Sequence, residues 1–372
     1  MPDSQSAIED LQSATVKPQT TNVKGDTGNR SYSKSHGASQ SCRQNLLINI
    51  PKKIFALTTA LSFFSISLSQ TIPDSTIIAD PYPELQYGNS SQIKKPRLWL
   101  VAGTHAAFWT GSYIALNKTW YADFPKEQFH FFNDFKEWKQ MDKGGHVWTS
   151  YQLSRLSTAM WKWTGLSEKK SVWLGSASGL AYQSIIEIQD GYSAEWGFSW
   201  TDMAANITGV AAYAAQQLGW KEQRIQIKMS YYPYDYSPDL RTRRDQLFGK
   251  KPAERILKDY NAQTYWASIN LKSFFRKSNL PAWLNISVGY GADGLLGGFE
   301  NKWTDKDGNM ITRSDVERKR QFYLAPDIDL TKIKTRSKFL RSLFFLVNMV
   351  KVPGPTISWD SKGTFKAFLL YF

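Results

Sequence analysis

Residues 142–165 read DKGGHVWTSYQLSRLSTAMWKWTG. Asp142 and His146 are four positions apart, which places both side chains on one face of a helix. The stretch beyond them is largely apolar or small, and Gly165 stands where helix-terminating glycines are common. The pattern predicts a helix over Asp142–Trp163 that carries a polar pair near its start.

Three neighbouring segments also show helical patterns. Ser167 and Ser199 are suitable N-caps for two of them. Gly191 and Gly219 follow the ends of the same two segments, where a helix commonly stops. The three segments are Leu98–Leu116, Glu168–Asp190 and Ser199–Leu218. We therefore predict a helical bundle of four helices over residues 96–222.

The segment Leu98–Leu116 admits two interpretations. It contains no Asp, Glu, Lys or Arg, it is long enough to cross a bilayer, and basic residues flank it. Its many Gly, Ala, Ser and Thr residues suit a buried helix of the bundle equally well. The sequence leaves both interpretations open.

From Arg224 onward the apolar residues recur at every second position, which is typical of half-buried strands. The alternating segments are Arg224–Tyr232, Tyr265–Lys272, Leu284–Tyr290, Phe322–Leu330 and Phe368–Phe372. Lys338–Val350 reads as an amphipathic helix that ends before Pro353. The predicted fold class is α+β: an N-terminal four-helix bundle followed by an antiparallel sheet of about five amphipathic strands with one amphipathic helix.

The end of the chain bears on where the β-rich region, residues 223–372, would lie. Phe372, with Tyr371 beside it, resembles the C-terminal signal of outer-membrane proteins. We expect this region to pack on the bundle or against a membrane. A sheet edge left free would accept an added strand.

The N-terminal part divides into three segments by composition. Residues 1–50 begin with a long polar stretch and are predicted to be a disordered tail. Residues 51–69 combine a basic start, an apolar run and small residues two apart, which is the pattern of a signal peptide. An uncleaved N-terminal membrane anchor is the alternative. Residues 70–95 are predicted to be a linker.

Composition and charge point to a membrane surface. Aromatic residues make up 15% of the chain, and Trp and Tyr favour membrane interfaces, although an aromatic-rich soluble core is the alternative. The formal net charge is +14 without a nucleic-acid motif, so we expect membrane lipid rather than nucleic acid as partner. Cys42 is the single cysteine, which argues against an intrachain disulfide or a thiolate metal site. It precedes the signal segment, so we do not expect it to be the acylated cysteine of a mature lipoprotein.

Polar residues on the otherwise apolar helices form a candidate site. Helical spacing places one polar set on a single face of the third helix and another on a single face of the fourth. Four antiparallel helices would bring these faces together with the polar start of the second helix. The predicted site consists of His146, Glu187, Asp202 and Asn206, supported by Asp142, Lys143, Gln183, Asp190, Ser199 and Gly209.

Three roles for this site stay open. Buried charges need partners, so the side chains are expected to contact one another or a bound ion. They would form a structural network that fixes helix register, a general acid–base site in which Glu187 and Asp202 orient His146, or a metal or ligand site. The sequence contains no nucleophile elbow, phosphate-binding loop or HExxH motif. No cofactor is predicted.

Several longer motifs resemble a known family. They are WKQMDKGGHVWTSYQLSRL (138–156), YQSIIEIQDGYSAEWGFSWTDMAANITG (182–209), ILKDYNAQTYW (256–266), VGYGADGLLGGF (288–299) and LTKIKTRSKFLR (330–341). Together they resemble the YfiM-like family of predicted periplasmic lipoproteins, and especially its longer outer-membrane-associated members. The order Asp-Lys-x-x-His, Glu, Asp-x-x-x-Asn-x-x-Gly is more loosely similar to VanZ-like membrane proteins. The resemblance implies an exported location and implies no established reaction.

The expected function follows from these observations. We expect an exported, non-enzymatic cell-envelope component at the periplasmic face of the outer membrane, as a scaffold or an accessory to a membrane assembly. Membrane lipid or an outer-membrane protein is its expected partner. The alternative is an enzyme that acts on a lipid or cell-wall substrate through His146, Glu187, Asp202 and Asn206.

Overall fold

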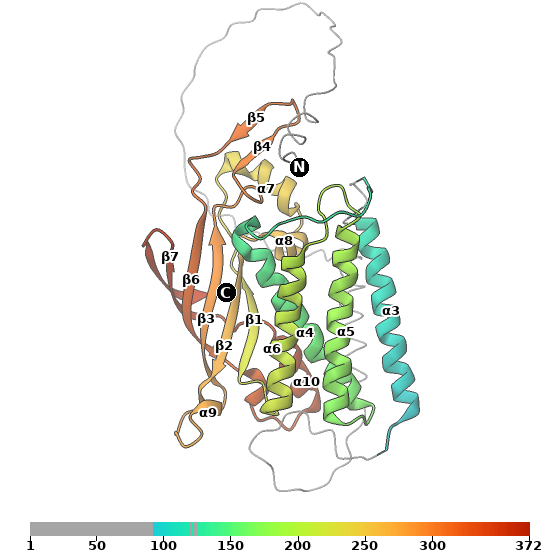
Figure 1. The fold of residues 1–372 in the computed structure, drawn as a ribbon. Helices are drawn as coiled ribbons and strands as arrows, with labels where there is room; N and C mark the ends of the chain where they lie inside the picture. Colours follow the sequence, from blue (N-terminus) through green and yellow to red (C-terminus); the bar gives the residue numbers. More distant parts are fainter. Residues whose placement is uncertain (1–91, 120, 122–124) are drawn as a thin grey trace, which may run out of the picture. The chain divides into compact units, whose positions relative to one another are not determined.

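The computed structural model describes residues 92–119, 121 and 125–372, all of which belong to one unit of the chain. The predicted tail, the predicted signal peptide and the predicted linker up to residue 91 lie outside the described residues. The described part is a mixed α+β fold, as predicted, with long helices beside an antiparallel sheet (Figure 1).

Four long helices precede the sheet in the sequence. They are α3 (Lys95–Thr119), α4 (Met141–Trp163), α5 (Glu168–Asp190) and α6 (Trp200–Gly219). Glycines allow α4 to approach α5 and α6 closely. A Cβ at Gly179 of α5 would lie 2.8 Å from Ser154 Oγ, and one at Gly209 of α6 would lie 3.0 Å from the carbonyl carbon of Val147. Gly209 therefore allows α6 to approach α4 closely.

The helix ends largely follow the predicted signals. Ser167 accepts a hydrogen bond from the backbone of Lys170, and Ser199 accepts one from the backbone of Asp202 at 3.0 Å. These bonds satisfy amide groups that have no partner inside the first turn. Other boundaries were misplaced. Gly219 is the last residue of α6 rather than the residue beyond it, and α3 extends three residues beyond the predicted Leu98–Leu116 at each end.

The sheet has six antiparallel strands in the order β1-β2-β3-β6-β7-β8. They are β1 (Ile225–Tyr231), β2 (Gln263–Asn270), β3 (Leu284–Asp293), β6 (Lys319–Ile328), β7 (Gly354–Asp360) and β8 (Phe365–Tyr371). The predicted sheet lacked β7, because this short strand begins with Gly354 and Pro355, residues that ordinarily mark loops.

Shorter elements complete the fold. They are α7 (Arg241–Phe248), α8 (Pro252–Lys258), α9 (Leu271–Phe274), the hairpin of β4 (Lys302–Thr304) and β5 (Met310–Thr312), and α10 (Lys338–Val347). α10 lies within the predicted helix Lys338–Val350 and ends three residues earlier. None of the other short elements was predicted.

The sheet exposes an apolar face. The cross-strand pairs Val288–Leu324 and Leu324–Ile357 place apolar side chains next to one another on this face. Near β1 the face is covered by helices, since Ile227 packs against Tyr151 of α4. Farther along the sheet it is open. The outer sheet face consists of Ile286, Val288, Leu324, Ile357 and Trp359, which are between 36% and 41% exposed except for Val288 at 47%.

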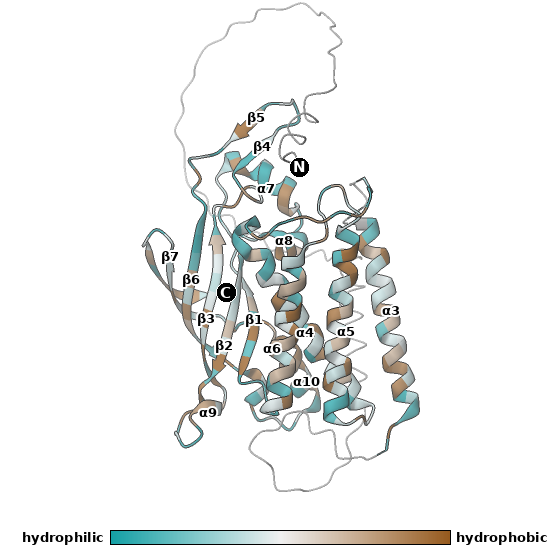
Figure 2. Ribbon diagram, viewed as in Figure 1, coloured by the Kyte–Doolittle hydropathy of each residue, from teal (hydrophilic) through white to brown (hydrophobic). Residues whose placement is uncertain are grey.

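The opposite face of the sheet is polar and buried. Lys228 Nζ lies 2.9 Å from Asp327 Oδ2, and neither side chain has any exposed surface. Ser268 Oγ also donates to Asp327 at 2.6 Å, and Gln226 Nε2 donates to Asp329 at 2.7 Å. The burial of β1, β3 and β6 largely alternates, as predicted from the sequence, and both hydrophilic and hydrophobic stretches lie along the strands (Figure 2). On β3 and β6, however, the polar side of the alternation is the buried one.

α4 connects the helices to the sheet. Trp148 Nε1 donates to the backbone oxygen of Met349 at 3.1 Å, and Gln152 Nε2 donates to that of Ile227 at 2.6 Å. The helix that carries the polar pair is therefore fixed to β1 and to the chain just before β7. Within the described part of the chain, no helix is both long and apolar enough to cross a membrane, α3 included.

Candidate functional site

The predicted polar residues converge between three helices. α4 supplies Asp142, Lys143 and His146, α5 supplies Gln183 and Glu187, and α6 supplies Asp202 and Asn206. Each set repeats at helical spacing, so each helix turns its polar face towards the other two. The structure therefore brings His146, Glu187, Asp202 and Asn206 together, while their role stays a prediction.

One side of the His146 ring faces amide and carboxyl groups. Nδ1 lies 3.1 Å from Asn206 Oδ1 and 3.4 Å from Glu187 Oε1. Gln183 Nε2 is 3.4 Å from the same nitrogen but donates to Asn206 Oδ1 at 3.0 Å. Since Asn206 presents an acceptor oxygen, the neutral imidazole carries its proton on Nδ1 and a lone pair on Nε2.

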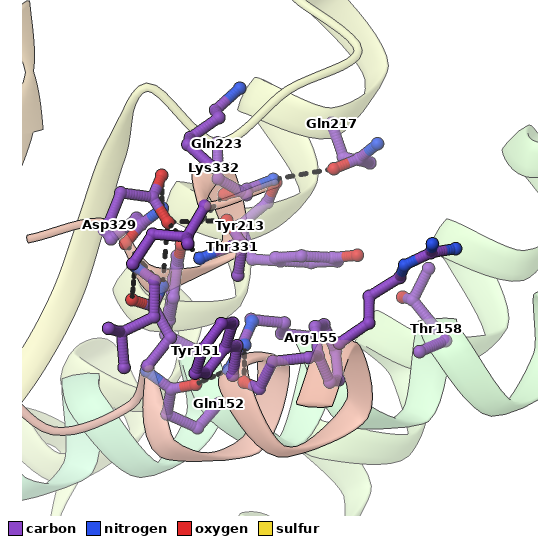
Figure 3. A pocket seen from close by; sticks show the side chains of 18 of the residues that line it. Tyr151, Gln152, Arg155, Thr158, Tyr213, Gln217, Gln223, Asp329, Thr331 and Lys332 are labelled. Carbon is purple, nitrogen blue, oxygen red and sulfur yellow. Dashed lines mark hydrogen bonds between the residues drawn. The ribbon is translucent and has the colours of Figure 1, made fainter. Parts of the chain in front are cut away.

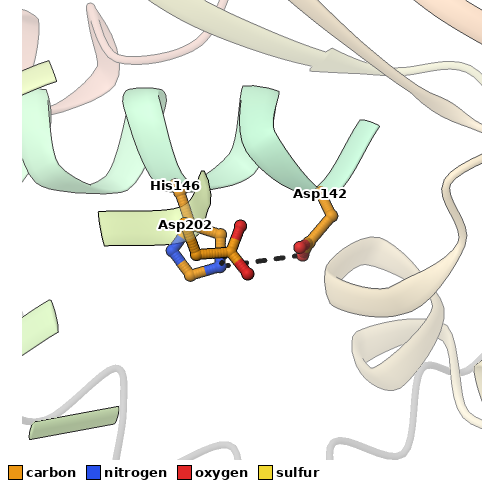
Figure 4. Close-up of side chains that lie close together, drawn as sticks. All are labelled: Asp142, His146 and Asp202. Atoms are coloured by element: carbon orange, nitrogen blue, oxygen red, sulfur yellow. Dashed lines mark ion pairs between the residues drawn. The ribbon is translucent and has the colours of Figure 1, made fainter. Parts of the chain in front are cut away.

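The other side of the ring faces two aspartates. His146 Nε2 lies 3.7 Å from Asp142 Oδ1 and 3.7 Å from Asp202 Oδ1 (Figure 4). These distances are too long for hydrogen bonds. The atoms of the three residues all lie within 4.8 Å of one another, which makes them the group best placed to hold a metal ion among the described residues.

A single lysine forms ion pairs with three carboxyl groups beside the ring. Lys143 Nζ lies 2.6 Å from Asp134 Oδ2, 2.7 Å from Asp202 Oδ1 and 3.1 Å from Asp142 Oδ2. Asp134 Oδ1 also accepts hydrogen bonds from Ser199 and Thr201, at 2.6 and 2.5 Å. Asp134 is thus well satisfied, whereas negative charge remains at Asp142 and Asp202.

The electrostatics follow from this surplus of carboxyl groups. Burial alone would raise the pKa of Asp142, but His146, when it is protonated, and the ammonium of Lys143 outweigh burial and lower it. Burial and the charge of Asp142 raise the pKa of Asp202. Burial and neighbouring carboxylates raise the pKa of Glu187 to about 9. Glu187 is therefore protonated at neutral pH, when its pKa lies above the solution pH.

The chain enters α4 through a strained turn. Trp138, Lys139 and Gln140 have φ angles of 48°, 54° and 64°, values that L-residues adopt at a cost in free energy. The turn is held from the sheet, because Tyr290 and Arg320 both donate hydrogen bonds to the backbone oxygen of Lys139. The position of Asp142 thus depends on β3 and β6 as well as on its own helix.

Tyrosines from the β-rich region cover the start of α4. Tyr260 OH donates to Asp142 Oδ1 at 2.8 Å. The ring of Tyr265 packs over Gly144 and Gly145, where a Cβ at Gly145 would lie 3.0 Å from the tyrosine oxygen. Side chains there would push Tyr265 away, so the glycine pair lets the sheet close over the site.

Other predicted residues lie apart from the ring. Asp190 accepts a hydrogen bond from Tyr121 at 2.6 Å, and Ser199 serves as the N-cap of α6 and as a donor to Asp134. His105 lies 2.7 Å from Ser157, and His130 pairs with Glu127 at 3.0 Å. Neither histidine approaches His146 within the described contacts.

Sequence reasoning missed Asp134 and Tyr260. Asp134 lies between helices, outside any periodic segment, and Tyr260 precedes β2. No spacing rule connects either residue to α4. The only sequence signal was indirect: Lys143 is a cation in an apolar core and therefore requires nearby carboxylates.

A cavity of about 110 Å³ lies away from these residues, beside α4, α6 and α10. None of its lining residues belongs to the site around His146 (Figure 3). His146 is nevertheless reached by solvent, since its side chain is 16% exposed and that of Asp142 is 23% exposed.

Residues 130–217 match the model of a family described as predicted periplasmic lipoprotein (DUF2279). The match includes all the residues that converge on His146 from α4, α5 and α6, together with Asp134, and ends before the sheet begins. No curated protein and no solved structure matches the chain. The family's description agrees with the predicted location, which is export to the periplasm or outer membrane.

Proposed function

We propose that this chain is a non-enzymatic envelope component that rests on the periplasmic face of the outer membrane through its sheet and α10. The observation that carries the proposal is the orientation of the sheet. Its apolar outer sheet face is exposed while its polar face, including the Lys228–Asp327 pair, is buried. Contiguous exposed apolar surface of this kind marks an interaction site.

α10 extends the apolar surface. Phe339, Leu340, Leu343 and Val347 of this helix are between 38% and 59% exposed. The chain from Leu330 to Trp359 contains six Lys or Arg residues and no Asp or Glu. A basic helix with exposed Phe and Leu side chains is typical of segments that lie in the interface of an anionic bilayer.

The cavity beside α10 adds charge complementarity to lipid headgroups. Arg155, Lys162, Lys332 and Arg341 line it, and Asp329 is its one acidic lining residue (Figure 3). Asp329 is engaged by Gln226, Thr331 and Asn348. Lys162 and Lys332 also pair with Glu168 and Glu222, at 3.1 and 3.4 Å. The positive charge that remains near an exposed apolar helix suits phosphate groups at a membrane surface.

The finer role is a scaffold or an accessory to a membrane assembly. In this proposal the bundle of α3 to α6 holds the site around His146, and the sheet attaches the bundle to the membrane. The resemblance of residues 96–372 to the longer outer-membrane-associated YfiM-like proteins supports this role. An outer-membrane protein bound at the outer sheet face is the competing occupant.

Vesicle flotation tests the proposal. The full chain is mixed with vesicles of phosphatidylethanolamine and phosphatidylglycerol, or with neutral phosphatidylcholine vesicles. We expect flotation with the anionic vesicles and weaker binding to the neutral ones. Replacing Lys334 and Lys338 by Gln should weaken binding to anionic vesicles roughly 30-fold, at about 1 kcal/mol per cation.

A matched variant removes the same charge elsewhere. Lys302 and Lys306 are exposed residues of the β4–β5 hairpin, remote in sequence from α10, and replacing both by Gln should leave flotation unchanged. An equal loss of vesicle binding in the two double variants would show that binding depends on net charge alone and not on the position of the lysines. If the wild-type chain floats with none of the vesicles, the proposed membrane contact is wrong. A protein would then be the occupant of the outer sheet face.

An enzyme that acts on a lipid or cell-wall substrate is the second candidate. The observation that favours it is the convergence of His146 with Glu187, Asp202 and Asn206 at a place that solvent reaches. His146 would act as the general base or acid. Turnover of a lipid-linked cell-wall precursor that His146→Gln abolishes, without loss of folding, would support this candidate over a purely attached scaffold.

A further inference from the structure

The space between His146 Nε2 and the two aspartates is built to hold a positive charge. With its proton on Nδ1, the ring directs a lone pair towards Asp142 Oδ1 and Asp202 Oδ1. Three electron-rich atoms that face one another repel unless a proton or a cation lies between them. The spacing is too long for direct hydrogen bonds, so it leaves room for an ion.

A buried oxygen atom without a hydrogen bond lies at the same place. Asp202 is 5% exposed. Its Oδ1 has no hydrogen-bond partner among the described residues, although it stands 2.7 Å from the ammonium of Lys143. A buried carboxylate oxygen without a hydrogen bond is costly, and a bound cation would remove that cost.

Charge balance favours a doubly charged ion. Lys143 is the one lysine among Asp134, Asp142 and Asp202. When all three carboxyl groups are ionised, one ammonium against three carboxylates leaves two negative charges. A divalent cation neutralises them, and Lys143 can stay with Asp134 and with the outer oxygen of Asp142.

We infer that Asp142, His146 and Asp202 form a binding site for a divalent transition-metal ion, Zn²⁺ or Mn²⁺. An imidazole with two carboxylates suits these ions better than Mg²⁺ or Ca²⁺, which prefer oxygen ligands alone. An ion about 2.1 Å from both atoms of a pair 3.7 Å apart would subtend an angle of about 120°. The two aspartate oxygens, which lie within 4.8 Å of each other, need to close to about 3.5 Å. Rotation of a carboxylate provides this movement, and water fills the remaining positions.

The neighbouring residues have the arrangement of an outer shell. Metal-bound histidines commonly donate their second ring N–H to an oxygen, and here Nδ1 faces Asn206 Oδ1 at 3.1 Å. Tyr260 OH donates to Asp142 Oδ1 at 2.8 Å and orients that carboxylate. Gln183 in turn donates to Asn206 Oδ1 at 3.0 Å. This inference does not depend on membrane attachment.

Calorimetric titration of the full chain tests the site. The purified chain is stripped with a chelator, exchanged into chelator-free buffer and titrated with ZnCl₂ and with MnCl₂. We expect one ion per chain, with Zn²⁺ bound more tightly than Mn²⁺. Asp202→Asn and His146→Gln should each weaken Zn²⁺ binding at least about 100-fold, and Asn206→Ala about 10–100-fold.

A second histidine supplies the matched control. His130 lies 3.0 Å from Glu127 on the surface and is the most plausible place for adventitious Zn²⁺ among the described histidines. His130→Gln should leave the titration unchanged. Binding that disappears in His130→Gln and persists in His146→Gln would overturn the inference.

A measurement on the unaltered chain keeps the test valid if a variant fails to fold. The ¹⁵N resonances of the His146 ring distinguish a metal on Nε2 from a doubly protonated ring. We expect Zn²⁺ to shift Nε2 strongly and to leave the Nδ1 proton in place. A ring protonated on both nitrogens, with no response to Zn²⁺ or Mn²⁺, would show a structural imidazolium network and overturn the site.

Discussion

The substitution Gly209→Ala tests how the site is assembled. Gly209 lies on α6 three residues after Asn206, and the helix contacts α4 at this point. In Gly209→Ala the new Cβ would stand 3.0 Å from the carbonyl carbon of Val147, and nearer still to its oxygen and to Ser150 Oγ. Ordinary contacts begin near 3.4 Å, so α6 must move away from α4.

The magnitude follows from two opposing effects. Alanine stabilises a helix interior by about 1 kcal/mol relative to glycine. Overpacking costs about 1–3 kcal/mol, and the upper end applies because the obstructing atoms include backbone, which cannot rotate away. We expect Gly209→Ala to lower the free energy of unfolding by about 2 kcal/mol. The same shift would lengthen the His146–Asn206 contact of 3.1 Å.

Urea denaturation followed by circular dichroism measures this effect. Gly103→Ala is the control, since Gly103 lies within α3 and a Cβ there would meet no atom within 4 Å. That variant should gain about 1 kcal/mol. Equal stability of the two variants would refute the close approach of α6 and α4, and with it the geometry of the site.

Two further predictions concern buried charge. Lys228→Met should lower the free energy of unfolding by about 3–5 kcal/mol, because it leaves Asp327 buried without its cation. Adding Asp327→Asn should recover part of this loss. Urea denaturation of the single and the double variant measures both effects. Burial and the charges of Asp142 and Asp134 raise the pKa of Glu137 from 4.5 to about 7. The stability from this group is therefore fully present below pH 4.5 and is lost as the pH rises through 7, so Glu137→Gln should flatten the pH dependence of unfolding in that window. An unchanged pH profile in Glu137→Gln would contradict the burial of this carboxyl group.

Helix positions and the site could be predicted because they depend on local rules. The caps at Ser167 and Ser199 are local signals, and α5 begins and ends at the predicted residues. Helical spacing alone placed Glu187 and Asp202 on faces that the structure turns towards His146. Local periodicity is enough when each helix contributes one polar face to a common core.

Other features depend on the whole fold and could not be predicted. Alternation along β3 and β6 separates two faces, but it does not say which face the rest of the chain covers. The buried side here can be polar because Lys228 pairs with Asp327 and donates to the backbone oxygen of Ile328, while Gln226 donates to Asp329. Asp134 belongs to an irregular segment, where no spacing rule applies.

The structure links the site to the sheet. Lys139, just before α4, is held by Tyr290 and Arg320 of the sheet, and Tyr260 holds Asp142. A change at the sheet would therefore reach the site through a few hydrogen bonds. The strained φ angles at residues 138–140 mark the segment whose conformation such a change would alter.

We propose that the outer sheet face contacts lipid, and position-specific fluorescence tests this contact most directly. Cys42 is first replaced by Ser. Single cysteines that replace Val288, Leu324 or Ile357 then carry an environment-sensitive dye. A cysteine that replaces Asp307 in the β4–β5 hairpin is the reference position. On addition of phosphatidylglycerol-containing vesicles we predict a blue shift, and quenching by a lipid-borne quencher, at the three sheet positions and no change at Asp307. Equal responses at all four positions, or no response at the sheet, would contradict the account.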